Sequence, residues 1–229
     1  MRGRWPVRRN GRRNCSQDWR STRSCCSAPP ARTLAEITAD ASMLVIGSRG
    51  AGVFSAMALG SVSRYAATHS RCPVVVRRQE TTSVHREIVV GVGDLVHSAA
   101  VLGFAFEEAA LRKARLIAVH AWSSFLPAPG PGSKLTAGER AAANPSQLSP
   151  GTGARLQDIL TGWQEKYPAV EIGTEIMHAH PAHVLAAASA CADLVVLGRS
   201  AGATDRSGVG SVIHAVLHHA QGPVAIVAG

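Results

Sequence analysis

The chain has 229 residues, and 46% of them are hydrophobic, a proportion typical of a protein with a buried core. No apolar run approaches the roughly 18 residues of a membrane-spanning helix, so we expect no such helix. The net charge of +9 would favour nucleic-acid binding, but residues 1–23 alone carry eight arginines and one aspartate, a net +7. The rest of the chain has 16 basic and 14 acidic side chains and is therefore close to neutral.

The arginine-rich segment, residues 1–29, is predicted to be a solvated, disordered tail. Its paired arginines are not followed by an apolar stretch, so it lacks the pattern of a secretory signal. The alternative is a basic arm that binds the phosphates of a nucleic acid, which is the less favoured hypothesis. Three of the five cysteines lie in this tail, and no two cysteines form a CxxC pair. We therefore expect neither a disulfide framework nor a zinc site, and a location in the reducing cytoplasm.

An internal repeat organises the rest of the chain. Residues 30–47 match residues 181–198 at 8 of 18 positions, and residues 60–76 match residues 210–226 at 6 of 17. Each copy is predicted to contain a helix, a strand, a glycine-containing loop, a second helix and a second strand. The strands are continuous apolar runs, as in a parallel sheet that is covered on both faces.

Residues 86–229 are predicted to form a complete domain, because further elements precede the repeated part. These are a strand at 86–92, a helix at 98–114, a strand at 115–121, a helix at 153–167 and a strand at 169–177. The alternation of strands and helices predicts an α/β, doubly wound domain with a five-stranded parallel sheet, a Rossmann-like fold. Residues 30–79 are then a partial copy of this fold, and residues 80–85 are a linker.

The stretch VIGSRGAGVFSAMALGSV, residues 45–62, has the features of a phosphate-binding loop. Gly47, at the end of an apolar strand, permits a sharp turn, and Gly50 lets phosphate oxygens approach the backbone. Gly60 and Ser61 then begin a helix, whose first N–H groups and positive dipole end favour an anion. A tight turn followed by a capped helix would explain the same residues without any ligand.

This loop, with MLVI before it and HSRCPVVV after it, resembles the nucleotide loop of the universal stress protein family, whose G-x2-G-x9-G-S/T pattern binds ATP. The resemblance covers residues 30–79 and 86–229. It implies a fold like that of the adenine nucleotide alpha hydrolases, a tandem arrangement with a truncated first domain, and an ATP-binding regulatory role in the stress response. The nucleotide-binding residues that we expect from it are Gly47, Ser48, Arg49, Gly50, Gly60, Ser61, Val62, Val92, Asp94, Gly198, Arg199, Gly202, Gly210, Ser211 and Val212.

Two departures from the family pattern weaken this ATP site. The family usually has an aspartate after the first strand of the domain, but Gly93 stands at that position and Asp94 is displaced by one residue. The second loop is one residue shorter than the first and has Ala201 where the family has glycine. We therefore expect weak or absent ATP binding; the alternative is a member that binds no nucleotide and acts by protein association. Without a Ser-His-Asp order or paired acids, we expect no catalysis beyond slow ATP hydrolysis.

We call the partial copy, residues 30–79, the first unit and the complete domain, residues 86–229, the second unit. The final strands of the two units, residues 73–78 and 223–228, are expected to pair antiparallel. Each is apolar and would otherwise leave an open sheet edge, which favours aggregation. The resemblance implies the same pairing, either within the chain as a pseudo-dimer or between two copies of it. Val75 is then expected to lie near Ala225.

Two groups of histidines suggest hypotheses that we do not favour, a metal site for the first group and a proton relay for the second. His178, His180 and His183 lie at a predicted strand-to-helix turn, and no carboxylate or cysteine joins them at ligand spacing. His214, His218 and His219 are expected to face different sides of the last helix. We expect all of them to be surface or packing residues.

Overall fold

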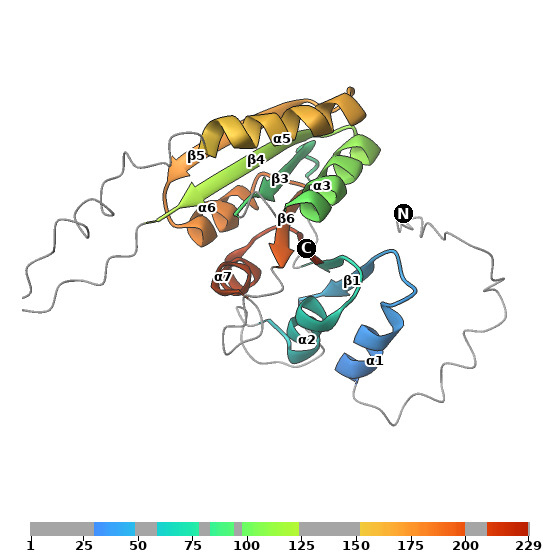
Figure 1. Ribbon diagram of the computed structural model, residues 1–229. Coiled ribbons are helices and arrows are strands. Elements are labelled where there is room, and N and C mark those ends of the chain that lie inside the picture. Colours follow the sequence, from blue (N-terminus) through green and yellow to red (C-terminus); the bar gives the residue numbers. More distant parts are fainter. Residues whose placement is uncertain are drawn as a thin grey trace, which may run out of the picture.

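The computed structural model describes residues 30–48, 59–77, 83–93, 98–123, 152–199 and 210–228, and the predicted N-terminal tail lies outside these residues. They form one seven-stranded sheet with helices on both faces (Figure 1). The helices are α1 (Pro30–Ile37), α2 (Ser61–His69), α3 (Ala99–Arg112), α5 (Thr152–Lys166), α6 (Pro181–Ala188) and α7 (Ser211–His219). The strands are β1 (Leu44–Gly47), β2 (Val74–Arg77), β3 (Glu87–Gly91), β4 (Arg115–Trp122), β5 (Ile172–His178), β6 (Leu194–Arg199) and β7 (Val224–Ala228). Within this described part, no helix has both the length and the hydrophobicity to cross a membrane.

The strand order in the sheet is β1-β2-β7-β6-β3-β4-β5. All neighbouring strands run parallel except β2 and β7, which run antiparallel. The strands from β7 to β5 therefore form the predicted five-stranded parallel sheet, and the order in which the chain adds strands reverses between β3 and β6. The α/β doubly wound class is confirmed, and β1 and β2 extend the same sheet.

The helices lie in two layers, because each crossover between parallel strands must return over one face of the sheet. α6 and α7 cover one face, where Val195 and Leu197 of β6 point, and α2 continues this layer. α3 and α5 cover the other face, to which Leu194 and Val196 of the same strand point. Successive residues of β6 thus fill the two cores alternately, which explains why the strand sequence is apolar without interruption.

The two units repeat their strand register as well as their sequence. Leu44 pairs with Val74 in the first unit, and the residues that the repeat makes equivalent, Val195 and Val224, pair in the second. The predicted antiparallel pairing of the final strands is also confirmed, since Val75 of β2 lies opposite Ala225 of β7. This pairing covers two apolar edges that would otherwise be exposed.

A carboxylate anchors the segment that enters β3. The backbone N–H groups of His85 and Arg86 donate to the two carboxylate oxygens of Asp193, each over 2.8 Å. Arg86 has a φ angle of 55°, in the left-handed region, so this turn needs outside support. Because Asp193 directly precedes β6, its carboxylate fixes the entry to β3 against the neighbouring strand.

A group of aromatic rings fills the space between α3 and α5. Phe106 of α3 is fully buried, and its ring centroid lies 5.8 Å from that of Trp163 and 5.6 Å from that of Tyr167. A Cβ atom on Gly103 would lie 2.9 Å from Cη2 of Trp163, so the absence of a side chain lets the indole lie against α3. This contact holds α5 on the sheet and makes Phe106 central to one of the two cores.

Candidate functional site

The carboxyl ends of β3 and β6 lie side by side where the winding of the sheet reverses. Ligands of open α/β sheets bind in the crevice at such a point, because the chain leaves the two strands toward opposite faces. α3 follows β3 over one face, and α7 follows β6 over the other (Figure 1). Four of the predicted site residues lie here: Val92 just after β3, Gly198 and Arg199 in β6, and Gly210 just before α7.

Two glycines at this edge have different surroundings. A Cβ atom on Gly198 would lie 2.7 Å from Cγ2 of Val101, so a larger residue would push α3 away from β6. A Cβ atom on Gly93 would meet no atom of the described residues within 4 Å. Packing therefore explains glycine at position 198, whereas no described residue occupies the space beside Gly93.

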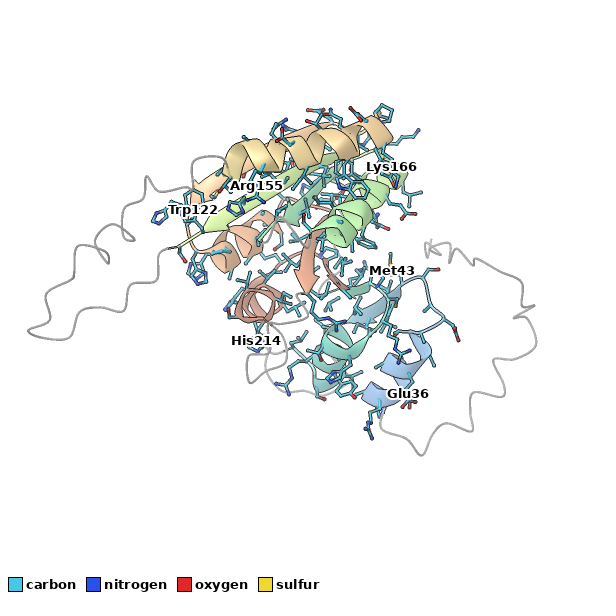
Figure 2. The ribbon with its side chains drawn as sticks, in the orientation of Figure 1. Glu36, Met43, Trp122, Arg155, Lys166 and His214 are labelled. Atoms are coloured by element: carbon cyan, nitrogen blue, oxygen red, sulfur yellow. The ribbon has the colours of Figure 1, made fainter. Side chains whose placement is uncertain are left out.

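An imidazole joins the end of β3 to β4. Nδ1 of His120 lies 2.7 Å from the carbonyl oxygen of Val92, and the N–H of Val92 donates to the carbonyl of Val119 over 2.9 Å. The ring centroids of His120 and His178 lie 5.9 and 5.7 Å from that of Trp122, which is labelled in Figure 2. A row of rings thus runs from Val92 along the ends of β4 and β5. The contact between His120 and Val92 could not be predicted, because a main-chain carbonyl has no signature in the sequence.

Helices α2 and α7 begin in the same way. Their N-cap residues, Gly60 and Gly210, both have ψ near 150° and give the helix no side-chain cap. The first N–H groups of a helix need partners from outside it and favour an anion. The predicted site residues at these positions are Ser61 and Val62 in α2, and Ser211 and Val212 in α7. Both serines are exposed and both valines are half-buried, so the serine hydroxyls are accessible to a ligand.

Hydrogen bonds bring the two ends of the first loop together. The N–H of Gly60 donates to the carbonyl of Ser48 over 2.8 Å, and the hydroxyl of Ser63 donates to the carbonyl of Gly47 over 2.7 Å. Ser48 itself is buried, with 2% of its surface exposed, so its side chain lies away from solvent. The middle of the loop, with Arg49 and Gly50, lies outside the described residues.

Arg199, at the end of β6, binds the protein backbone of the other unit. Its guanidinium donates to the carbonyls of Thr68, Ala67 (3.2 Å) and Ser70 (2.9 Å), which end α2. A cation at this end of a helix also interacts favourably with the helix dipole. Burial lowers the pKa of Arg199 from its ordinary value. Because the guanidinium is engaged in these contacts, we do not include Arg199 in the proposed nucleotide-binding site.

The Arg199→Ala substitution is expected to lower the free energy of unfolding by about 1.5–3 kcal/mol, because it removes charge-assisted bonds and leaves carbonyls without a partner. Urea unfolding followed by circular dichroism would measure the change. Arg64→Ala, an exposed position on α2, is the control and should change stability by less than about 0.5 kcal/mol. Equal effects of the two substitutions would contradict the role of Arg199 as a connection between the units.

Three further residues named in the sequence analysis lie outside the described residues. Asp94 follows β3, and Ala201 and Gly202 follow β6. The predicted effect of the displaced aspartate and of the shorter second loop on ATP binding therefore stays a prediction.

The expectation that His214, His218 and His219 face different sides of the last helix is wrong for His214 and His218. Their ring centroids lie 4.4 Å apart, because residues four apart in a helix are neighbours on one face. His180 and His183 are also close, at 5.0 Å. Among the described residues, no three potential metal ligands come together in a group.

The sheet order, with both faces covered by helices, defines a doubly wound α/β protein of the Rossmann-like class. The profile of the universal stress protein family matches residues 22–78 and 85–228, and the chain belongs to this family. A universal stress protein of Mycobacterium bovis is 37% identical over 203 residues, which cover 86% of this chain and 65% of that protein. One of Mycobacterium tuberculosis is 34% identical over 199 residues, covering 85% and 64%. The chain thus spans a little less than two thirds of the length of these relatives.

Solved structures show the same fold. A universal stress protein from Archaeoglobus fulgidus has a TM-score of 0.59 at 20% identity, covering 87% of this chain and 65% of that one. A protein of Pseudomonas aeruginosa described as functionally unknown has a TM-score of 0.60 at 15% identity, covering 96% and 79%. At such identities the likeness concerns the fold alone.

Proposed function

We propose that the protein is a regulatory module of the stress response that binds an adenine nucleotide, ATP, at the carboxyl edge of its complete domain, residues 86–229. One observation carries the proposal: α7 begins without a side-chain cap beside the point where β3 and β6 reverse the winding. Residues 30–79 act as a partial second domain, and residues 80–85 join the two. We place the protein in the cytoplasm.

The complete domain is the better candidate for the site, because it has strands on both sides of the crevice. Phosphates would lie at the start of α7, near Gly210, Ser211 and Val212. The base and ribose would lie beside Val92, at the end of β3, where the space next to Gly93 is open. The first unit has the same helix start at α2, but the described residues place no counterpart of β3 beside β1.

Binding is expected to be weak, because Gly93 offers no side chain to the nucleotide. A charge-assisted hydrogen bond contributes on the order of 1.5–3 kcal/mol, so its loss reduces affinity by about one to two decades. The proposed role is regulatory, through the conformation of the loaded domain, with at most slow hydrolysis of the bound ATP.

Isothermal titration calorimetry of the full chain with ATP tests the proposal. We expect saturable binding at one site, and we expect Ser211→Glu to weaken it at least tenfold, because a carboxylate at the start of α7 repels phosphate. An acidic residue at a helix start also favours the helix, so the variant should keep its fold. Ser61→Glu is the matched control at the start of α2 and should leave the affinity within about twofold.

Two other results of the titration would contradict the proposed site. Heats at the level of dilution for the unmodified chain would contradict ATP binding. A loss of binding in Ser61→Glu alone would place the site in the first unit instead. If the unmodified chain gives only heats of dilution, the second candidate function, protein association without a nucleotide, is preferred. It is favoured by the absence of a side chain at Gly93 and by the backbone contacts that occupy Arg199.

A further inference from the structure

The outer edge of β1 is open in the described part of the protein. β1 pairs with β2 on one side, and no other described strand pairs with it. Its counterpart β6 is flanked on both sides, by β7 and by β3. Among the described strands, β1 and the opposite edge strand, β5, are thus the two at which the sheet can still form strand-to-strand hydrogen bonds.

A valine of β1 is exposed where its counterpart is buried. Val196 of β6 is fully buried, because it packs in the core that α3 covers. Val45 occupies the equivalent position in β1 and is 62% exposed. The described residues place no helix over this face of β1, so an apolar side chain lies beside an open edge.

The helix before β1 has a partly uncovered inner side. Its counterpart α6 packs on the sheet, where Leu185 is 4% exposed. α1 packs against α2 and has no buried residue, and Leu34, which the repeat matches to Leu185, is only half-buried. Figure 1 shows α1 and α2 at the end of the molecule remote from α5. A strand added beside β1 would find α1 next to it on one face and Val45 on the other.

The two edges of the sheet differ in the features that prevent association. Edge strands of natural proteins are usually protected by charged residues or proline. β5 has exposed Glu175 and His178, and Glu171 just before it forms an ion pair with Arg115. β1 has the sequence LVIG, without a charge or a proline. Within the described residues, its edge therefore has no such protection.

We propose that this edge pairs antiparallel with β1 of a second copy of the chain, around a two-fold axis at Val45. Such a contact is self-complementary, because it places the two Val45 side chains opposite each other and Leu44 opposite Ile46. The chain already contains a junction of this kind, the antiparallel pairing of the short apolar strands β2 and β7. The sheet then continues through both copies.

The dimer is expected to be weak, because β1 has only four residues. A contact between two strands of four residues each forms an interface at the lower end of the size range for specific association. We expect a dissociation constant on the order of 1–100 µM, within the range that sedimentation experiments measure. The contact does not depend on a nucleotide.

Sedimentation velocity of the full chain over a wide concentration range tests this proposal. We expect reversible dimerisation of the unmodified protein and at least a tenfold increase of its dissociation constant in Val45→Lys and in Val45→Glu. Two like charges would then lie opposite each other in the dimer. Val84→Lys is the matched control, because Val84 is 77% exposed and lies away from β1. Melting curves should show that all three variants fold, since both valines are exposed.

A mixture of the two variants tests the two-fold register. Equal amounts of Val45→Lys and Val45→Glu should associate again, because opposite charges then lie across the axis. A monomeric unmodified protein, or a dimer that neither substitution at Val45 weakens, would overturn the proposal. An equal effect of Val84→Lys, or no association in the mixture, would also overturn it.

Discussion

Replacing Phe106 with alanine is expected to lower the free energy of unfolding by about 3–5 kcal/mol. The ring is fully buried and touches two other aromatic rings, those of Trp163 and Tyr167. Its removal leaves a cavity between α3, α5 and the sheet, because these rings cannot all move to fill it. Since a domain has only about 5–15 kcal/mol of stability, the loss is a large share of the total. Equilibrium unfolding in urea measures it.

Leu111→Ala is the matched control for Phe106→Ala. Leu111 lies on the same helix, and 63% of its surface is exposed. Both substitutions put alanine into α3, so helix propensity does not favour the larger residue in either case. We expect Leu111→Ala to change the stability by less than about 0.5 kcal/mol. Similar losses at the two positions would contradict the core that we describe between α3 and α5.

Restoring the family pattern is expected to tighten ATP binding at least tenfold. The restored variant combines Gly93→Asp, Ala201→Gly and the insertion of one residue after Asp205. Gly93→Asp has the clearest structural basis, because a Cβ atom at this position meets no described atom within 4 Å. The new carboxylate can accept a charge-assisted hydrogen bond, which contributes on the order of 1.5–3 kcal/mol. The other two changes lengthen the second loop and restore its glycine. Calorimetric titration with ATP measures the gain.

Gly93→Ala is the control for this repair, because it adds a side chain without a polar group and should give none of the tenfold gain in affinity. Two results would contradict the explanation. Tight ATP binding by the unmodified chain would mean that Asp94 and Gly202 fulfil these roles in a different register. A restored variant that gains nothing would mean that the crevice is closed for another reason.

The repeat allowed the most detailed structural prediction, the contact between Val75 and Ala225. Two apolar strands end equivalent units, and the pairing of β2 with β7 satisfies the edges of both. The register within each unit also follows from the sequence match, since Leu44–Val74 and Val195–Val224 are equivalent pairs. Apolar patterns of this kind predict folds well, because burial constrains every residue of the strand.

The contacts of Arg199 and Asp193 could not be predicted. Arg199 binds carbonyls of α2 about 130 positions earlier in the chain, and Asp193 accepts backbone N–H groups at the entry to β3. Every residue has a carbonyl, and almost every residue has an N–H group, so a main-chain partner leaves no pattern to find. An arginine beside a glycine-rich loop therefore resembles a phosphate ligand until its partners are known.

Gly198 shows a similar limit for glycines. The family pattern explains it as part of a nucleotide loop, whereas the structure adds a packing reason, the side chain of Val101 at 2.7 Å from an added Cβ. One glycine can satisfy both requirements, and the sequence does not separate them. The described residues give Gly93 no such packing reason, which makes it the better position at which to test the binding site.

The central claim is that ATP binds at the start of α7 in the complete domain. Hydrogen–deuterium exchange of the full chain, with and without saturating ATP, tests it most directly, because it locates the protected amides. We predict slower exchange in residues 211–214 and around Val92, with no change in the equivalent residues 61–64 of α2. Unchanged exchange at the start of α7 in the presence of saturating ATP would contradict the claim, as would protection confined to α2.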